Sequence, residues 1–335
     1  MTALRAGRML LAAALVLVLG VLAWIHLAVP IDLVTADLGR HLSNGREFFT
    51  AGRILATNFY SYTVPDFPAP CHHWGAGVLF YSVWKAGGFP GLSLGYAALL
   101  CLTFLLTLVH ARRRSSGVAV LLAGVLALPL LAYRVEIRPE GISTLLLAAE
   151  FFLLEEWRRG RCSGRWLIVL PLFQLFWVNV HILFFCGLLL IAFYVIEAFA
   201  KGSFGFRALG AAAGASAAVT FINPFVLSGA LQPALIFQGY GYEIAENQSV
   251  FFMMKRFPDQ PVFAYYLAAF LLVTGLLAGR MWKEKDWRPA FPQFFLVVVI
   301  GLIGCKAVRG IAMAGFVFIP VAAGIAGTLQ TQFTG

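Results

Sequence analysis

The most constraining feature of this sequence is a succession of long apolar stretches separated by short charged loops. Most stretches run over about 15 to 22 residues, close to the length that an α-helix needs to cross a hydrocarbon core of roughly 30 Å. Hydrophobic residues make up 61% of the 335 residues, and charged residues only 12%. The mean hydropathy of +0.84 lies far above that of soluble domains. The chain is therefore predicted to be an all-α, polytopic transmembrane helical bundle.

The apolar stretches predict about ten membrane spans. They cover residues 9–30, 91–110, 117–133, 141–157, 166–181, 183–199, 208–223, 262–279, 293–305 and 310–328. A further segment, 74–86, is short for a span, so it is either an eleventh crossing or a re-entrant or interfacial segment. Whether this segment crosses decides the side of the membrane on which every later loop lies.

The basic residues predict the orientation, because cytoplasmic loops are enriched in Lys and Arg. One set of loops holds 13 Lys or Arg and comprises 111–115, 158–165, 201–207 and 280–288. The other set holds 6 and comprises 134–140, 223–261 and 306–309. The first set is expected in the cytoplasm, together with the N-terminus, where Arg5 and Arg8 precede the first span. This topology accounts for the net charge of +10, so no nucleic-acid partner is predicted.

Residues 1–335 are expected to form a single transmembrane domain without a soluble domain. The longest polar stretches, 31–73 and 224–261, are predicted to be outer loops. Within the first, apolar residues recur at helical spacing from Thr35 to Ala51, which indicates a helix lying along the membrane interface. The five cysteines are scattered singly, which indicates neither a disulfide framework nor a zinc site.

Asp37 begins the most polar part of the first outer loop. It lies one helical turn from His41, with Arg40 beside it, so a carboxylate and an imidazole would share one helix face. Such a pair suits general-base chemistry at a membrane surface. The alternative is structural, because an acid at a helix start also caps the free amide groups and interacts with the helix dipole.

Arg138 lies in a turn rich in charge between two expected spans. The stretch from Arg134 to Glu140 holds two arginines and two acids within seven residues. The planar guanidinium group suits phosphate oxygens. The alternative is that either arginine pairs with Glu136 or Glu140 within the turn.

Two further clusters are expected at the outer rim. Trp177, Asn179 and His181 end one apolar run just before the next begins. His181 is either functional or a structural hydrogen-bonding group. Lys306 and Arg309 share a helix face, where they either bind a lipid phosphate or extend to the headgroups.

The remaining polar groups carry weaker signals. Glu150 is the one acid deep within an expected span, and it lacks the chain of partners that a proton relay needs. His72 and His73, near Asp66, are adjacent and would point to different sides of a regular element. No metal-binding motif and no nucleotide-binding glycine loop is present, so no obligatory metal site is predicted.

In their order and spacing, several short motifs resemble the GT-C superfamily of polytopic glycosyltransferases, the bacterial mannosyltransferase-like enzymes among them. The motifs are Asp37, His41-Leu42, Gly45, Ser61-Tyr62-Thr63, Trp74, Arg138-Pro139 and Trp177-Val-Asn179-Val-His181. Asn223-Pro224, Glu246 and Arg309 are weaker agreements. Each motif alone has little specificity.

The resemblance implies a GT-C fold and an activity at the outer face of the bacterial cytoplasmic membrane. A sugar would be transferred, with inversion, from a polyprenyl phosphate to a glycan, lipid or protein acceptor. Asp37 would be the general base, with His41 or His181 assisting. No cofactor is obligatory by this resemblance, and a divalent cation is compatible but not indicated. The substrate and its phosphate would be bound by Arg40, Tyr62, His73, Trp74, Arg138, Asn179, Glu246, Lys306 and Arg309.

One departure from the family pattern concerns Asn58. Related sequences often carry an Asp just before the Phe-Ser-Tyr-Thr segment, and Asn58 takes that place here. Asp66 or Glu246 could supply a second carboxylate. The alternatives are a transporter or flippase for lipid-linked saccharides and a non-catalytic subunit of a membrane complex.

Overall fold

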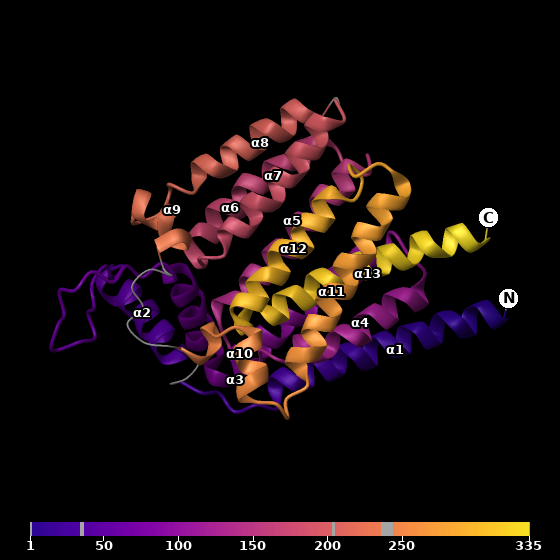
Figure 1. Ribbon diagram of the computed structural model, residues 1–335. Coiled ribbons are helices and arrows are strands. Elements are labelled where there is room, and N and C mark those ends of the chain that lie inside the picture. Colours follow the sequence, from indigo (N-terminus) through magenta and orange to yellow (C-terminus); the bar gives the residue numbers. More distant parts are fainter. Residues whose placement is uncertain (1, 34–36, 203–204, 236–243, 335) are drawn as a thin grey trace. The chain divides into compact units, whose positions relative to one another are not determined.

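The described part of the chain is helical. The computed structural model describes residues 2–33, 37–202, 205–235 and 244–334 (Figure 1). Within these ranges it contains thirteen α-helices and no β-strand, and Thr57 and Pro68 form one isolated backbone bridge. The prediction of an all-α chain is thereby confirmed.

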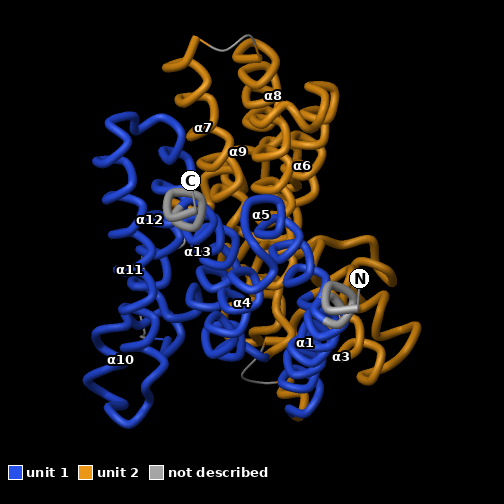
Figure 2. The backbone as a smooth tube through the Cα atoms, turned by 90° about the vertical axis from the view of Figure 1, so that its right-hand side faces the viewer, with its two compact units in different colours: residues 1–29, 100–135, 242–335 blue, residues 30–99, 136–241 orange. Residues whose placement is uncertain are grey.

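The chain divides into two compact units (Figure 2). Unit 1 contains residues 1–29, 100–135 and 242–335, and unit 2 contains residues 30–99 and 136–241. Helix α3 (Trp74–Arg112) contributes to both units. The prediction of a single transmembrane domain stays a prediction.

Unit 1 is built around its last helix. Its helices are α1 (Thr2–Leu27), the second part of α3, α4 (Gly117–Leu131), α10 (Val250–Arg256), α11 (Val262–Glu284), α12 (Phe291–Lys306) and α13 (Ile311–Thr334). In the window Val308–Thr328, 83% of the residues are buried, compared with 17% in Met9–Leu27. Gly315 lets α13 approach α4 closely, because an added Cβ would lie 3.0 Å from Leu130. The core of this unit is therefore α13, whereas α1 is peripheral.

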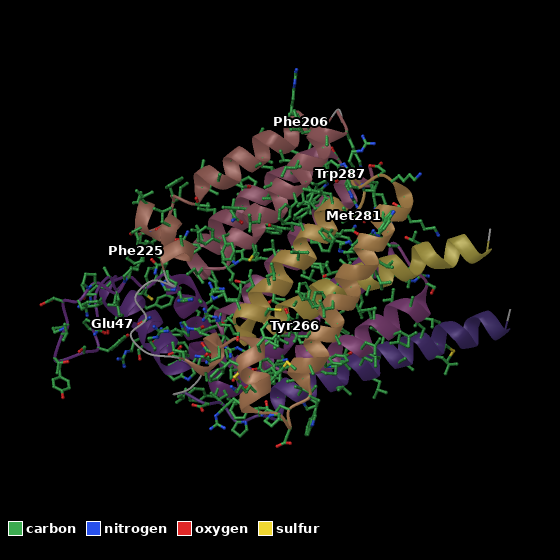
Figure 3. The ribbon with its side chains drawn as sticks, viewed as in Figure 1. Glu47, Phe206, Phe225, Tyr266, Met281 and Trp287 are labelled. Carbon is green, nitrogen blue, oxygen red and sulfur yellow. The ribbon has the colours of Figure 1, made fainter. Side chains whose placement is uncertain are left out.

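Aromatic side chains join α11 to its neighbours in unit 1. Tyr266, labelled in Figure 3, donates from its hydroxyl to the carbonyl of Gly301 on α12 at 2.6 Å. Its ring stacks on Phe270 and on Phe318 of α13. This buried hydroxyl is satisfied as a buried polar group must be.

Unit 2 is a set of neighbouring helices with polar loops at one end. Its helices are α2 (Leu38–Ala51), the first part of α3, α5 (Pro139–Arg158), α6 (Val169–Val180), α7 (Phe184–Ala200), α8 (Phe206–Val219) and α9 (Val226–Leu235). A 3₁₀ turn, Gly164–Ile168, precedes α6. Helices α6, α7 and α8 lie side by side (Figure 1).

Charged groups hold α5 and α7 together at the far end of unit 2 from the polar loops. Glu155 is fully buried and accepts hydrogen bonds from Tyr194 at 2.6 Å and from Arg158 at 2.5 Å. Arg158 also reaches Glu197 on α7 at 3.1 Å. Because each buried charge has an opposite partner, this network is a structural connection between the two helices.

Helix α3 contains a sharp reversal at Gly88. This glycine has φ 61 and ψ −158, which is not helical. An added Cβ on Gly95 would lie 3.6 Å from a side-chain carbon of Val83, although a straight helix would separate these residues by about 18 Å. The chain therefore folds back on itself at Gly88.

The first arm of this helical hairpin, residues 74–87, is about 20 Å long, shorter than a hydrocarbon core of roughly 30 Å. It packs on α2, because an added Cβ on Gly45 would lie 2.3 Å from the carbonyl oxygen of Gly77. The short length of this arm and its packing on the amphipathic α2 favour the interfacial interpretation of segment 74–86.

The expected spans coincide with helices, but their boundaries and the outer loops needed correction. Among the described residues, four helical segments are long and apolar enough to cross a membrane: Met9–Leu27, Trp74–Arg112, which includes the reversal at Gly88, Val262–Glu284 and Val308–Thr328. The expected helix from Thr35 begins at Leu38, and residues 34–36 lie outside the described residues. Within 224–261, helices α9 and α10 were not predicted, because elements of ten and seven residues are too short to show a clear apolar period.

Candidate functional site

Asp37 occupies the N-cap position of α2 in an unusual conformation. Its φ of 57 and ψ of 8 are left-handed, and its side chain makes no capping hydrogen bond. Only its backbone carbonyl enters the helix, by accepting from the His41 amide at 3.0 Å. The structural alternative of a capping carboxylate is therefore not what the structure contains. The carboxylate is 47% exposed and available for other contacts.

Two arginines flank the Asp37 carboxylate. Arg40 approaches its Oδ2 to 3.4 Å from the next turn of α2, and Arg138 approaches the same oxygen to 3.8 Å. Arg138 is the N-cap residue of α5, with Pro139 at the first helical position, and its side chain is only 8% exposed. Asp37, Arg40 and Arg138 are called the Asp37 site below. The sequence predicted all three as site residues, and the structure brings them together.

A cluster of imidazole rings lies in the same unit. The ring of His73 lies 5.8 Å from His41, 4.0 Å from His72 and 5.0 Å from His181, between centroids. His41 and His181 are both buried. His72 and His73 were expected to point apart, but they lie in the turn before α3, where the alternation of a regular element does not apply. Within the described residues, no group of three or more His, Cys, Asp or Glu is arranged to hold a metal ion.

Burial determines the protonation of two of these rings. It is the main cause that lowers the pKa of His41 to about 3, and the neighbouring Arg40 lowers it further. Burial likewise lowers the pKa of His73 well below its ordinary value, with His72 as the next cause. Both rings are therefore neutral at pH 7 and are poor bases.

Trp74 and Asn179 connect three segments of unit 2. The indole Nε1 of Trp74 donates to Asn179 Oδ1 at 3.1 Å. The amide of Asn179 donates in turn to the carbonyls of Leu175 and Ile222, each at 2.9 Å. Both amide hydrogens of Asn179 are thus used within the protein. The hydrogen bond to Trp74 joins α3 to α6, and the expected binding of substrate by Asn179 stays a prediction.

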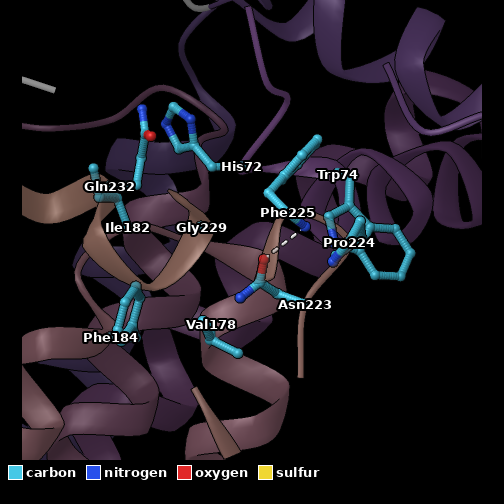
Figure 4. A pocket seen from close by; sticks show the side chains of 10 residues that line it. All are labelled: His72, Trp74, Val178, Ile182, Phe184, Asn223, Pro224, Phe225, Gly229 and Gln232. Carbon is cyan, nitrogen blue, oxygen red and sulfur yellow. Dashed lines mark hydrogen bonds between the residues drawn. The ribbon is translucent and has the colours of Figure 1, made fainter. Parts of the chain in front are cut away.

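Trp74 contributes to the lining of two hollows. One is an open groove of about 590 Å³, whose lining is predominantly apolar and includes Val78, Leu79, Phe176 and Ile222. The other, drawn in Figure 4, has room for about one water molecule and is lined by residues that include His72, Asn223 and Gln232. Asn223 is held locally, because its Oδ1 accepts from the Phe225 amide at 2.8 Å.

Unit 1 contains a second carboxylate between two arginines. Arg134 Nη2 lies 2.8 Å from Glu246 Oε2, and Arg309 Nη1 lies 3.7 Å from Glu246 Oε1. These three residues are called the Glu246 site below. Lys306 is the last residue of α12, and Arg309 lies in the short 3₁₀ turn Val308–Gly310 that follows. The sequence suggested Glu136 or Glu140 as partners of the arginines in this turn, and the contact between Arg134 and Glu246 was not predicted.

Tyr62 is not gathered with the other predicted site residues. Its side chain is 96% exposed. Its neighbours Ser61 and Thr63 lie 3.1 Å apart through their hydroxyls, and Ser61 Oγ accepts from the Val64 amide at 3.1 Å. The Ser-Tyr-Thr motif therefore forms a turn that presents Tyr62 outward.

Sequence reasoning missed Ser143, which is fully buried on α5. Its Oγ lies 2.7 Å from His181 Nδ1 and accepts from Trp177 Nε1 at 2.8 Å. A lone serine in an apolar run carries no signal of such a contact, because α5 and α6 meet only in the fold. Glu150, also on α5, is fully buried, and within the described residues its carboxylate has no hydrogen-bond partner, so no relay is visible there.

No protein-family model matches the sequence, and no curated protein is significantly similar to it.

Proposed function

We propose that this chain is a membrane glycosyltransferase of GT-C type, which transfers a sugar from a polyprenyl phosphate to an acceptor hydroxyl. The observation that carries the proposal is the Asp37 carboxylate. It is half-exposed, it caps no amide, and it lies 3.4 and 3.8 Å from two guanidinium groups. A carboxylate that caps no amide and has cations beside it suits a reaction in which a base acts next to a departing phosphate.

In the proposed reaction, Asp37 accepts the proton of an acceptor hydroxyl. The hydroxyl oxygen attacks the anomeric carbon and forms the new glycosidic bond. The bond from that carbon to the phosphate oxygen breaks, and the electron pair leaves with the polyprenyl phosphate, so the configuration is inverted. Arg40 and Arg138 are placed to neutralise the charge that develops on the phosphate.

Asp37 is a better candidate for the base than the nearby imidazoles. His41 is buried and its pKa is lowered to about 3, mainly by that burial, which leaves little basicity for removing a hydroxyl proton. The role proposed for His41 and His181 is therefore to orient groups by hydrogen bonding. Lys306 and Arg309 belong to unit 1, so the step is derived from Arg40 and Arg138 alone.

The apolar groove beside Trp74 supports a lipid-linked donor. Its volume of about 590 Å³ and its lining of aliphatic and aromatic side chains suit several isoprene units. A prenyl chain buried there gains stability in proportion to the apolar area removed from solvent. Trp74 lines this groove, and its indole is held in place by the hydrogen bond to Asn179.

The proposal also includes the orientation of the chain in the membrane. The excess of Lys and Arg in one set of loops favours a cytoplasmic position for those loops and an outer position for the Asp37 loop. The helical hairpin at Gly88 is consistent with this, because its short first arm packs on α2. The proposed location is the bacterial cytoplasmic membrane.

The proposal is tested by transfer of a labelled sugar from a panel of polyprenyl-phosphate donors, with purified protein in lipid nanodiscs. Asp37→Asn is expected to lower the transfer rate by roughly 10²- to 10⁴-fold while the donor still binds. The matched control is Asp259→Asn, which changes an exposed acid outside the Asp37 site and is expected to keep the wild-type rate.

Two outcomes would count against the enzyme. Donor binding without turnover in the wild type would refute the assignment for the donors used and favour a transporter or a non-catalytic subunit, as Asn58 does. Equal loss in the Asp37 and Asp259 variants would remove Asp37 from the role of base.

A further inference from the structure

Three buried oxygen atoms on α5 and α6 need a hydrogen-bond donor. Glu150 of α5 and Gln174 of α6 are both fully buried. Within the described residues, neither carboxyl oxygen of Glu150 has a hydrogen-bond partner, and the same holds for Oε1 of Gln174. Buried polar atoms in folded proteins are nearly always paired, so these three acceptors call for a donor.

Gly187 of α7 shows that two of these oxygens lie together. A Cβ added to Gly187 would lie 2.5 Å from Glu150 Oε2 and 2.9 Å from Gln174 Oε1. Two atoms so near to one point are close neighbours. Helices α5, α6 and α7 pack against one another within unit 2. Any side chain at position 187 would overlap both oxygens, so this three-helix contact requires glycine.

The orientation of the Gln174 amide follows from its other contact. Nε2 of Gln174 donates to the backbone carbonyl of Phe184 at 2.6 Å. A carbonyl only accepts, so the nitrogen faces Phe184, and the opposite assignment would set two acceptors against each other. Gln174 therefore presents an acceptor, not a donor, beside the Glu150 carboxyl group.

Within the described residues, no positive charge neutralises Glu150. On α5, Arg158 pairs with Glu155, more than one turn beyond Glu150. Helix α6 carries no charged residue, and His181 lies beyond its end. On α7, the ionisable group at this level is the thiol of Cys186, which is neutral or negative and never positive. The surroundings of Glu150 therefore offer no counter-charge to a carboxylate.

We propose that Glu150 is a proton-binding site, in which the carboxyl group holds a proton at pH 7 and donates it to Gln174 Oε1. One hydrogen suffices, because it turns a carboxyl oxygen into a donor and gives Gln174 Oε1 its partner. The second carboxyl oxygen stays a neutral acceptor, which costs far less to bury than a charge. An ionised carboxylate would instead be a buried charge that faces the negative end of an amide dipole.

The proton site joins two helices that also carry residues of the candidate functional site. Arg138 caps α5 about three turns before Glu150, and Asn179 follows Gln174 on α6 by about one and a half turns. Loss of the proton would set a charge against an acceptor beside Gly187 and drive α5 and α6 apart. The bound proton thus stabilises the packing of these helices. This inference uses no substrate and does not rest on the glycosyltransferase proposal.

The test records the protonation of Glu150 by infrared spectroscopy of the full-length protein in lipid nanodiscs at pH 7. Carboxylic acids and carboxylates absorb in separate regions of the spectrum. Glu150→Gln identifies the band of Glu150 by its loss, and it is expected to fold, because Gln has nearly the same size and also donates from its terminal group. The wild type is expected to show Glu150 as a carboxylic acid.

Gln174→Met tests the partner, because Met keeps the length of the side chain and removes the amide oxygen. Glu150 is expected to stay protonated, and its carbonyl band is expected to move to higher frequency as the hydrogen bond is lost. The matched control is Ser216→Ala, a buried position on α8 of the same unit, which is expected to leave the band unchanged. If Gln174→Met does not fold, Gln174→Asn takes its place, because its shorter side chain withdraws the oxygen.

The outcomes for this inference and for the proposed function can be told apart. A carboxylate band for Glu150 in the folded wild type would overturn the proton site. A carboxylic acid band that stays unchanged in a folded Gln174 variant would overturn the pairing with Gln174. Neither reading needs sugar transfer, so a protein without transferase activity could still confirm the proton site. A failed test at Glu150 would leave the role of Asp37 untouched.

Discussion

The Asp37 site and the Glu246 site each place one carboxylate between two arginines, but they differ in how closely the charges meet. Glu246 makes a direct hydrogen bond with Arg134 at 2.8 Å, and both side chains are largely buried, at 19% and 10% exposure. Asp37 lies 3.4 and 3.8 Å from its arginines, and its side chain is 47% exposed. A carboxylate and two arginines thus form a close, largely buried ion pair in one unit, which is called closed below, and a longer, more exposed one in the other, which is called open.

The difference indicates which site is available to a substrate. A closed and buried pair has already replaced its hydration with protein contacts, so removing one partner leaves an uncompensated charge. An open pair keeps part of its hydration and gains little from its present contacts. An anionic ligand can therefore enter the Asp37 site at low cost. This contrast makes the Glu246 site the natural internal control for the Asp37 site.

The largest expected effect on stability comes from the closed pair. Glu246→Gln should lower the free energy of unfolding by about 2 to 4 kcal/mol, because the largely buried Arg134 would lose the carboxylate charge that it contacts at 2.8 Å. Asp37→Asn should change it by less than about 1 kcal/mol, because the contacts of Asp37 with its arginines, at 3.4 and 3.8 Å, are longer than a direct hydrogen bond. Asn also adopts the left-handed conformation at least as readily as Asp. Unfolding midpoints of the two variants in the same detergent provide the measurement. Equal losses in both would remove the distinction between the two sites.

The next largest effect on stability concerns the packing of α2, which has Asp37 at its N-cap, against α3. A Cβ at Gly45 would lie 2.3 Å from the carbonyl oxygen of Gly77 and 2.4 Å from the Cβ of Tyr81. Gly45→Ala should therefore push α2 away from α3 and cost about 2 to 3 kcal/mol. Gly87→Ala is the control, because a Cβ there meets nothing within 4 Å, and it should be neutral or slightly stabilising. Thermal unfolding that ranks the two variants in the opposite order would contradict this packing.

The sequence predicted the helices and the composition of the Asp37 site, but not how its groups are arranged. Helices over the expected spans follow from apolar runs, whose signal is local. Asp37, Arg40 and Arg138 were recognised one by one from their polarity at expected membrane boundaries. Their meeting could not be derived from spacing, because Arg138 lies on a different helix about a hundred residues along the chain.

The contacts that the sequence did not predict have the same physical origin. Asn179 and Trp74 were expected to bind substrate, which stays a prediction, but the hydrogen bond between them joins segments far apart in sequence and carries no local signal. Ser143 carried no signal at all, since its two partners come from α6. The reversal at Gly88 was foreseeable only in part. Gly87-Gly88 with Pro90 marks a break in a helix, but the direction after the break depends on packing against Val83.

A third expected effect is on the pH dependence of stability, and it arises from the imidazole of His41, one helical turn from Asp37. Burial lowers the pKa of His41 from 6.5 to about 3, so between these values the unfolded chain binds a proton that the folded chain does not. The stability due to the neutral His41 is complete above pH 6.5 and is lost as the pH falls towards 3. Between pH 7 and pH 5 the loss should be about 2 kcal/mol.

This pH dependence can be assigned by comparing variants. Arg40, His181 and Arg138 act with burial to lower the pKa of His41, and Glu140 opposes them. His41→Asn should flatten the fall in the unfolding midpoint between pH 7 and pH 5, and Glu246→Gln should leave its slope unchanged. A slope unaltered by His41→Asn would mean that other groups carry the acid sensitivity.

The smallest expected effect on stability comes from Arg40. A change at this residue also tests most directly whether the Asp37 site is open to a ligand. Its pair with Asp37 is exposed on both sides, at 53% and 47%, so Arg40→Gln should change the free energy of unfolding by less than about 0.5 kcal/mol. In the proposed reaction the same change should raise the KM for a polyprenyl-phosphate donor about 3- to 10-fold in low salt. The difference should shrink in 0.5 M salt, at about which concentration the screening length is only a few ångströms. A loss of stability without any change in KM would mean that Arg40 closes the Asp37 site as Arg134 closes the Glu246 site.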